Sequence, residues 1–176
     1  FRKELISRTR KYGEKTAIVF SSLFFGLVHM NLFQFFYAFA LGLVFGYVYV
    51  RTSKLRYSVA MHMFVNFMGG VVAPWVVKNI DIDSLMNVLT SAENGDGTAM
   101  MQWIDQNATG MMIFSIYMLL YYGLIIAGVV LLIRERKNFE FYTAPEELPR
   151  GVRTSTAIMN VGVITYIVVT VIITAI

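Results

Sequence analysis

The sequence predicts an all-α fold, a polytopic transmembrane helix bundle with about five spans. Of its 176 residues, 57% are hydrophobic and only 15% are charged, which leaves too little polar surface for a soluble globule. The apolar residues gather in long runs separated by polar or basic segments, and a helix of about 20 apolar residues crosses the hydrocarbon of a bilayer. The chain has no cysteine, which excludes disulfides and thiolate chemistry.

The first part of the chain predicts two short spans. Residues 1–15 hold six Lys or Arg and indicate the interfacial end of a helix whose apolar part we expect upstream of this sequence. Spans at 16–29 and 32–50 follow, with a tight turn at Asn31 between them. The second span contains a GxxxG motif, formed by glycines 42 and 46, which lets a neighbouring helix approach closely.

A third span is expected over 57–77, where Pro74 kinks or ends the helix. Residues 78–108 then change in character, because they hold five acidic residues and a single lysine. We expect an outer loop there, with a short helix around Ile82–Leu89 and a turn at Asn94–Gly97.

The last part of the chain predicts two more spans joined by a polar segment. Residues 111–133 form a long uninterrupted apolar run and therefore a span. The connection 134–153 holds five Lys or Arg and two prolines. Residues 157–176 are apolar again and predict the final span.

We therefore expect one membrane domain over residues 1–176. Its parts are a motif-bearing core in 1–77, the outer acidic loop in 78–108, and two further spans with a cytoplasmic connection in 109–176.

The positive charges predict the orientation of this domain. Of the fifteen Lys and Arg residues, six lie in 1–15, three in 51–56, five in 134–153 and only one in 78–108. Strict alternation of the spans places the three basic segments on one side, which the positive-inside rule assigns to the cytoplasm. The sequence thus predicts a multi-pass protein of the cell membrane.

The only two histidines lie in short motifs on apolar segments. Phe25–His29 has the pattern FxxxH, and His62–Asn66 has the pattern HxxxN. Residues at i and i+4 share one helix face, and ionisable groups inside a membrane are candidates for function. An imidazole can ligate a metal, transfer a proton or donate a hydrogen bond to an oxyanion.

Two difficulties accompany a hydrolytic interpretation. The expected spans hold no Asp or Glu to deprotonate water, and the alternative base Glu4 is adequately explained as an i,i+4 surface partner of Arg8. Counted from the basic ends of their spans, His29 and His62 would differ in depth by roughly 12 Å at 1.5 Å per residue. Helix tilt would close that gap.

Taken in order, Arg2, Phe25–His29 and His62–Asn66 resemble the CPBP family, which comprises CAAX proteases and bacteriocin-processing enzymes and is also described as type II CAAX prenyl endopeptidase-like intramembrane proteases. Members of this family carry EExxxR, FxxxH and HxxxN/D on successive transmembrane helices. The resemblance covers about residues 1–75. It implies that Arg2 ends the first motif and that two glutamates precede Phe1, so we expect the chain by itself to be inactive.

The resemblance implies an intramembrane endopeptidase, a hydrolase acting on membrane-associated protein or peptide substrates in the lipid bilayer. Its catalytic residues would be Arg2, His29, His62 and Asn66, with an upstream glutamate to activate water. His29 would hold that water or a metal, whereas His62 and Asn66 would bind the metal or stabilise the oxyanion. Zn²⁺ suits two imidazoles and a carboxylate, which would make the enzyme a metalloprotease, but we favour a site without metal. No nucleic-acid partner is expected.

Two other functions stay open. His29 and His62 could be the axial ligands of a haem-binding membrane subunit, which would show an intense Soret band. The chain could also be a non-catalytic scaffold, immunity or transport partner with the same fold, whose cellular function would survive replacement of either histidine.

Overall fold

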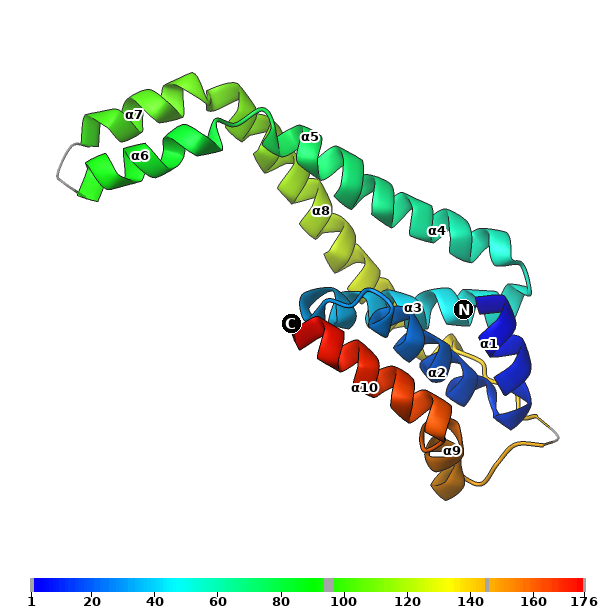
Figure 1. Cartoon of the computed structure of the whole chain (residues 1–176). Coiled ribbons are helices and arrows are strands. Elements are labelled where there is room, and N and C mark those ends of the chain that lie inside the picture. The colour runs from blue at the N-terminus through cyan, green and yellow to red at the C-terminus, as the bar shows by residue number, and fades with distance from the viewer. Residues whose placement is uncertain (1, 94–96, 145, 176) are drawn as a thin grey trace. The chain divides into compact units, whose positions relative to one another are not determined.

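The computed structural model describes residues 2–93, 97–144 and 146–175, and within these ranges it contains helices and loops but no strand (Figure 1). This confirms the all-α prediction. The chain forms two compact units, one made of residues 1–63 and 140–176 and the other of residues 64–139.

The first unit is built on a helical hairpin of α2 and α3. Its helices are α1 (Arg2–Thr9), the short 3₁₀ turn η1 (Arg10–Tyr12), α2 (Glu14–Leu27), α3 (Leu32–Thr52), most of α4 (Leu55–Phe67), α9 (Arg150–Ile158) and α10 (Val161–Ala175). The second unit holds the π-turn η2 (Met68–Val72), α5 (Ala73–Val77), α6 (Ile82–Glu93), α7 (Gly97–Gln106), α8 (Ala108–Arg134) and the 3₁₀ turn η3 (Glu135–Asn138).

The GxxxG motif of α3 packs directly on α2, as the sequence predicted. A Cβ atom placed on Gly42 would lie 2.9 Å from the Cβ of Ser22, and one on Gly46 would lie 3.1 Å from Ile18 Cγ2. Any larger side chain would force the helices apart. Beside this contact lies the hydrophobic core of the unit, formed by Ile6, Ala17, Ile18 and Val50.

The turn between α2 and α3 is tight, which confirms the prediction at Asn31. Met30 adopts φ = 48°, a left-handed conformation that reverses the chain within a few residues. The Asn31 side chain then accepts the N–H of Gln34 at 3.0 Å and caps the first turn of α3.

Three stretches among the described residues are long and apolar enough to cross a membrane: Leu32–Thr52, Leu55–Val77 and Ala108–Asn138. The other two expected spans are helices as well, but shorter, since α2 has 14 residues and α10 has 15. At 1.5 Å per residue each covers about 21–23 Å, less than the roughly 30 Å of hydrocarbon in a typical bilayer.

The final expected span begins later than predicted. The sequence suggested one helix from Ala157, but α9 ends at Ile158 and α10 begins at Val161. The reason is a new helix start, because the side chain of Asn160 accepts the N–H of Val163 at 3.0 Å. Phe24 stacks on Tyr166 with ring centroids 4.8 Å apart, which ties α10 to α2.

The third span continues past Pro74 and ends at Val77. The irregularity lies before the proline, in the π-turn Met68–Val72. Proline has no N–H to donate to the preceding turn, and i→i+5 bonding of a π-turn accommodates such a local mismatch.

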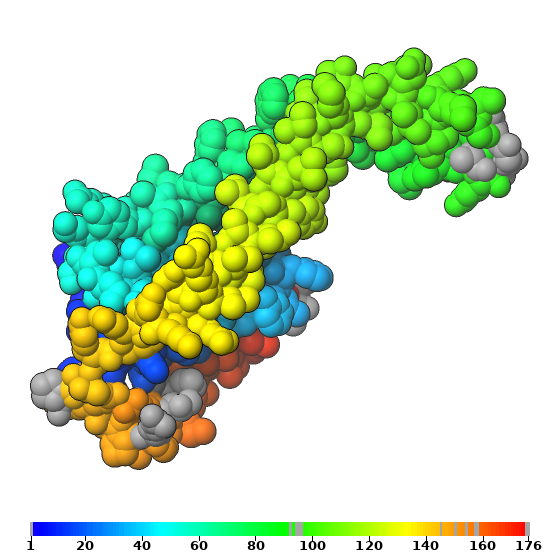
Figure 2. Space-filling model, turned by 180° about the vertical axis from the view of Figure 1, so that it is seen from behind, coloured from blue at the N-terminus to red at the C-terminus, as the bar shows by residue number. Residues whose placement is uncertain are grey.

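The acidic loop is a second helical hairpin. The helix expected at Ile82–Leu89 extends to Glu93, and α7 was not predicted; the expected turn falls on residues 94–96, which lie outside the described residues. Figure 2 shows α6 and α7 side by side in green.

Hydrogen bonds fix the base of this hairpin. The indole N–H of Trp103 donates to the carbonyl of Asp81 at 3.1 Å and to Ser84 Oγ at 2.8 Å. Asn107 accepts the N–H of Asp81 at 2.8 Å. The N–H of Ser84 bonds to the Asp81 carboxylate at 3.1 Å and holds the pKa of Asp81 below its ordinary value.

A buried carboxylate joins distant segments of the first unit. Glu14 is only 3% exposed and accepts hydrogen bonds from Arg10, from Arg51 and, at 2.9 Å, from the backbone N–H of Tyr142. The guanidinium of Arg51 also stacks over the ring of Tyr142, 4.3 Å from its centroid. We call these four residues the Glu14 clamp.

Candidate functional site around Phe25

The FxxxH motif forms a compact local unit at the end of α2. Phe25 is 8% exposed, and His29 lies in the turn that follows the helix. The Nδ1 atom of His29 lies 2.8 Å from the carbonyl oxygen of Phe25, and the two rings meet edge to face with centroids 5.2 Å apart. A neutral imidazole that donates from Nδ1 leaves Nε2 free to accept a proton or a hydrogen bond.

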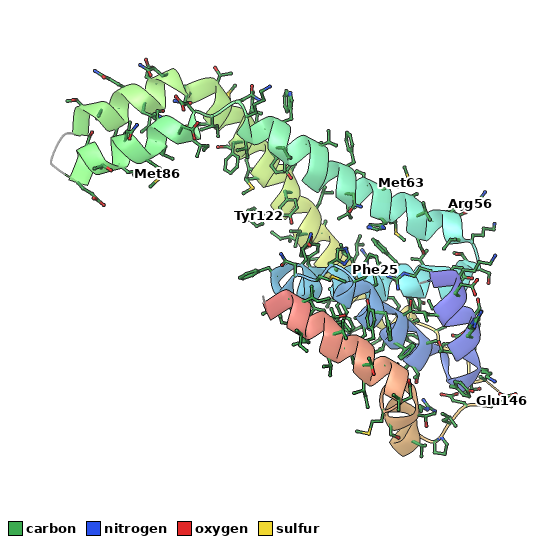
Figure 3. The ribbon with its side chains drawn as sticks, in the orientation of Figure 1. Phe25, Arg56, Met63, Met86, Tyr122 and Glu146 are labelled. Carbon is green, nitrogen blue, oxygen red and sulfur yellow. The ribbon has the colours of Figure 1, made fainter. Side chains whose placement is uncertain are left out.

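His62 approaches the same phenylalanine from α4. Its ring centroid is 5.2 Å from that of Phe25, again edge to face, and 6.2 Å from that of Phe45. The two imidazoles can therefore be no farther apart than twice 5.2 Å. This separation is smaller than the depth difference of roughly 12 Å expected from residue counting at 1.5 Å per residue. Figure 3 labels Phe25, on which both histidines pack.

Ser58 positions this part of α4. Its hydroxyl is buried and donates to the carbonyl of Phe45 on α3 at 2.9 Å. His62 follows Ser58 by four residues, so it lies one turn further along the same face. Asn66 lies one more turn along α4, within the second unit.

Arg2 reaches the same ring from α1. Its guanidinium carbon lies 4.8 Å from the centroid of Phe25, and Nη1 donates to Ser21 Oγ at 3.0 Å. The side chain is buried, and its Nη2 has no hydrogen-bond partner among the residues that the structure describes. A buried arginine nitrogen without a partner is costly, so this atom marks a place for an acceptor.

The structure thus brings His29, His62 and Arg2 together around Phe25. Sequence reasoning missed Ser21 and Phe45, which complete the surroundings of this ring. The signal for Ser21 was its position four residues before Phe25, on the same face of α2.

Glu4 does not join this cluster. Its side chain is 68% exposed and lies 3.4 Å from Arg8, one turn further along α1. This confirms the surface ion pair that the sequence suggested.

The described residues do not by themselves form a metal site. Within them, no group of three or more His, Cys, Asp or Glu residues is placed to hold a metal ion. His29 and His62 would supply two ligands, whereas a catalytic zinc usually takes three from the protein.

The fold and this cluster define a helical membrane protein with polar groups gathered on apolar helices. Residues 1–68 match the model of a family described as Rce1-like, type II CAAX prenyl endopeptidase Rce1-like. The match confirms the family resemblance over these residues and agrees with the CPBP family, and the matched family is one of proteases. Comparisons with curated proteins and with solved structures give no match.

Proposed function

We propose that this chain is part of an intramembrane endopeptidase that hydrolyses peptide bonds in membrane-associated proteins or peptides. One observation carries the proposal: both histidines of the chain and a buried arginine contact a single phenylalanine ring. The family match over residues 1–68 supports a hydrolase of the protease type.

In the proposed reaction, a glutamate removes a proton from water, and the resulting hydroxide attacks the carbonyl carbon of the scissile peptide. His29, with Nε2 directed to that water, helps to hold it. His62 and Asn66 donate hydrogen bonds to the oxyanion of the tetrahedral intermediate. The C–N bond then breaks, and the leaving amine takes the proton from the glutamate.

Nη2 of Arg2 is buried and has no hydrogen-bond partner within the described part of the chain, which supports a carboxylate in this site. Charge-assisted hydrogen bonds from arginine to a carboxylate are among the strongest in proteins. We propose that the glutamates of the first family motif, expected before Phe1, supply that carboxylate and the catalytic base.

Cleavage in liposomes tests the proposal. The probes are a prenylated peptide ending in a C-a-a-X sequence and an apolar single-span peptide, each added to the reconstituted full-length protein. We expect new peptide ends, identified by mass spectrometry, for at least one probe. Intact probes with correctly folded protein would contradict the protease function.

We expect this cleavage to proceed without zinc. The chain supplies two imidazoles to the site, and a glutamate with hydrogen-bonding histidines suffices for water attack. Elemental analysis should find zinc well below one atom per active protein, and a chelator should leave the rate unchanged. Stoichiometric zinc, with activity lost to the chelator and restored by the metal, would overturn this prediction.

We further propose a multi-pass protein of the cell membrane with its basic segments in the cytoplasm. The chain lacks native cysteine, so single cysteines at Lys54 and Glu93 can be labelled without background. An impermeant thiol reagent applied from outside should modify position 93 and spare position 54. Labelling of position 54 without labelling of position 93 would show that the orientation in the membrane is the reverse of the one proposed.

A further inference from the structure

The hairpin of α6 and α7 carries an exposed apolar stripe on each helix. On α6 the stripe consists of Ile82, Met86 and Leu89, spaced by four and three residues. On α7 it consists of Met101 and Ile104. Met86 and Met101 are 66% and 76% exposed, so they do not form the contact between the two helices.

Leu89 of the α6 stripe and Ile104 of the α7 stripe share one face of the hairpin, whereas Met86 and Met101 lie at its outer edges. Trp103 is buried where α7 meets α6, and its indole N–H bonds to Ser84 of α6. The half-buried Val88 lies one turn after Ser84 on the same face of α6, so we take Val88 as the contact position on that helix. In each helix the next residue, Leu89 or Ile104, is turned by about 100° and belongs to the stripe. Because the helices run antiparallel (Figure 1), equal rotations about opposite axes bring Leu89 and Ile104 to the same side.

The opposite face is polar and acidic. Its exposed residues are Asp83, Asn87, Gln102 and Asp105. Asn87 and Gln102 each precede the central contact position by one residue, so they are turned about 100° the other way. The hairpin is therefore amphipathic as a whole.

The base of the hairpin is joined directly to two helices long and apolar enough to cross a membrane. Only four residues separate α5 from α6, and Asn107 alone separates α7 from α8. The bonds of Trp103 and Asn107 to Asp81 hold this base rigid. Figure 3 shows Met86 pointing outward from α6, away from α7.

We propose that this hairpin lies on the outer surface of the bilayer, with the stripe face inserted among the lipids. Helices with a strong apolar face sink about 5–10 Å into the boundary between headgroups and acyl chains. The polar face carries carboxylates, so attraction to anionic lipids does not contribute. The partner is therefore a neutral, zwitterionic lipid surface.

Spin labels on single cysteines test this placement in the full chain, reconstituted into phosphatidylcholine bilayers. Leu89→Cys and Ile104→Cys report the stripe face, while Asn87→Cys and Gln102→Cys are controls on the opposite face. We expect collisions with lipid-soluble oxygen at 89 and 104, and with a water-soluble nickel chelate at 87 and 102. Adding anionic phosphatidylglycerol should not deepen the labels.

Two outcomes would overturn the proposal. Equal exposure of all four labels to the nickel chelate would show that the hairpin stands in water. Labels at 89 and 104 that are shielded from both reagents, with dipolar broadening between copies, would show that a second copy of the chain covers the stripe face. Because all four positions are exposed, circular dichroism should show unchanged helix content for each variant.

Discussion

Replacing His29 or His62 by alanine should abolish peptide-bond cleavage by the full-length protein while leaving its helices intact. Both imidazoles contact Phe25 with their edges, and neither fills the apolar core of the unit. Their loss removes groups proposed to hold the attacking water and to stabilise the oxyanion. Initial rates on the cleaved probe, together with circular dichroism, measure the two effects separately.

Asn66→Ala should lower kcat by roughly 10²-fold or more, the usual effect of removing one oxyanion donor. Met63→Ala is the matched control, because Met63 neighbours His62 on α4 and is 67% exposed. It should cleave at close to the wild-type rate. A folded His62→Ala protein that retains full activity would contradict the proposed role of this histidine.

Glu14→Gln should destabilise the protein by about 3 kcal/mol, the usual lower range for breaking a buried ion pair. The substitution leaves Arg10 and Arg51 facing a neutral amide in place of a carboxylate. It also weakens the bond that holds the backbone of Tyr142. Reversible unfolding in detergent micelles, followed by circular dichroism, measures the change.

The control is Glu4→Gln, which breaks the exposed pair of Glu4 and Arg8. Exposed ion pairs contribute little, so its unfolding curve should overlay that of the wild type. Equal stability of the two variants would show that the Glu14 clamp is not a stabilising element.

Sequence reasoning succeeded where the signal was local. Gly42 and Gly46 lie one turn apart and predicted close helix contact, and Asn31 has a side chain suited to capping the next helix. Residues at i and i+4 lie on the same helix face in any tertiary arrangement. The motifs at His29 and His62 therefore predicted which helix faces would meet.

It failed where the structure depends on contacts between distant residues. Glu14 bonds to a backbone group 128 residues away, and nothing near it in the sequence distinguishes it from the other charges of the basic segment. Trp103 is buried at the hairpin base by hydrogen bonds to Asp81 and Ser84, which belong to the other half of the hairpin and leave no signal near Trp103 in the sequence. The helix break at Asn160 lies within an apolar run that hydropathy alone predicts to be one continuous helix.

The Glu14 clamp also constrains the path of the chain through a bilayer. Glu14, Arg51 and Tyr142 are within hydrogen-bonding distance at one point, so all three lie on the same side of the membrane. In a bilayer, the segment between residues 14 and 51 then enters and leaves on the same side, so α2 and α3 go in and come out together as one hairpin. At 1.5 Å per residue α2 covers only about 21 Å. The turn that carries His29 is thereby held at the depth of the hydrocarbon rather than in the water beyond it.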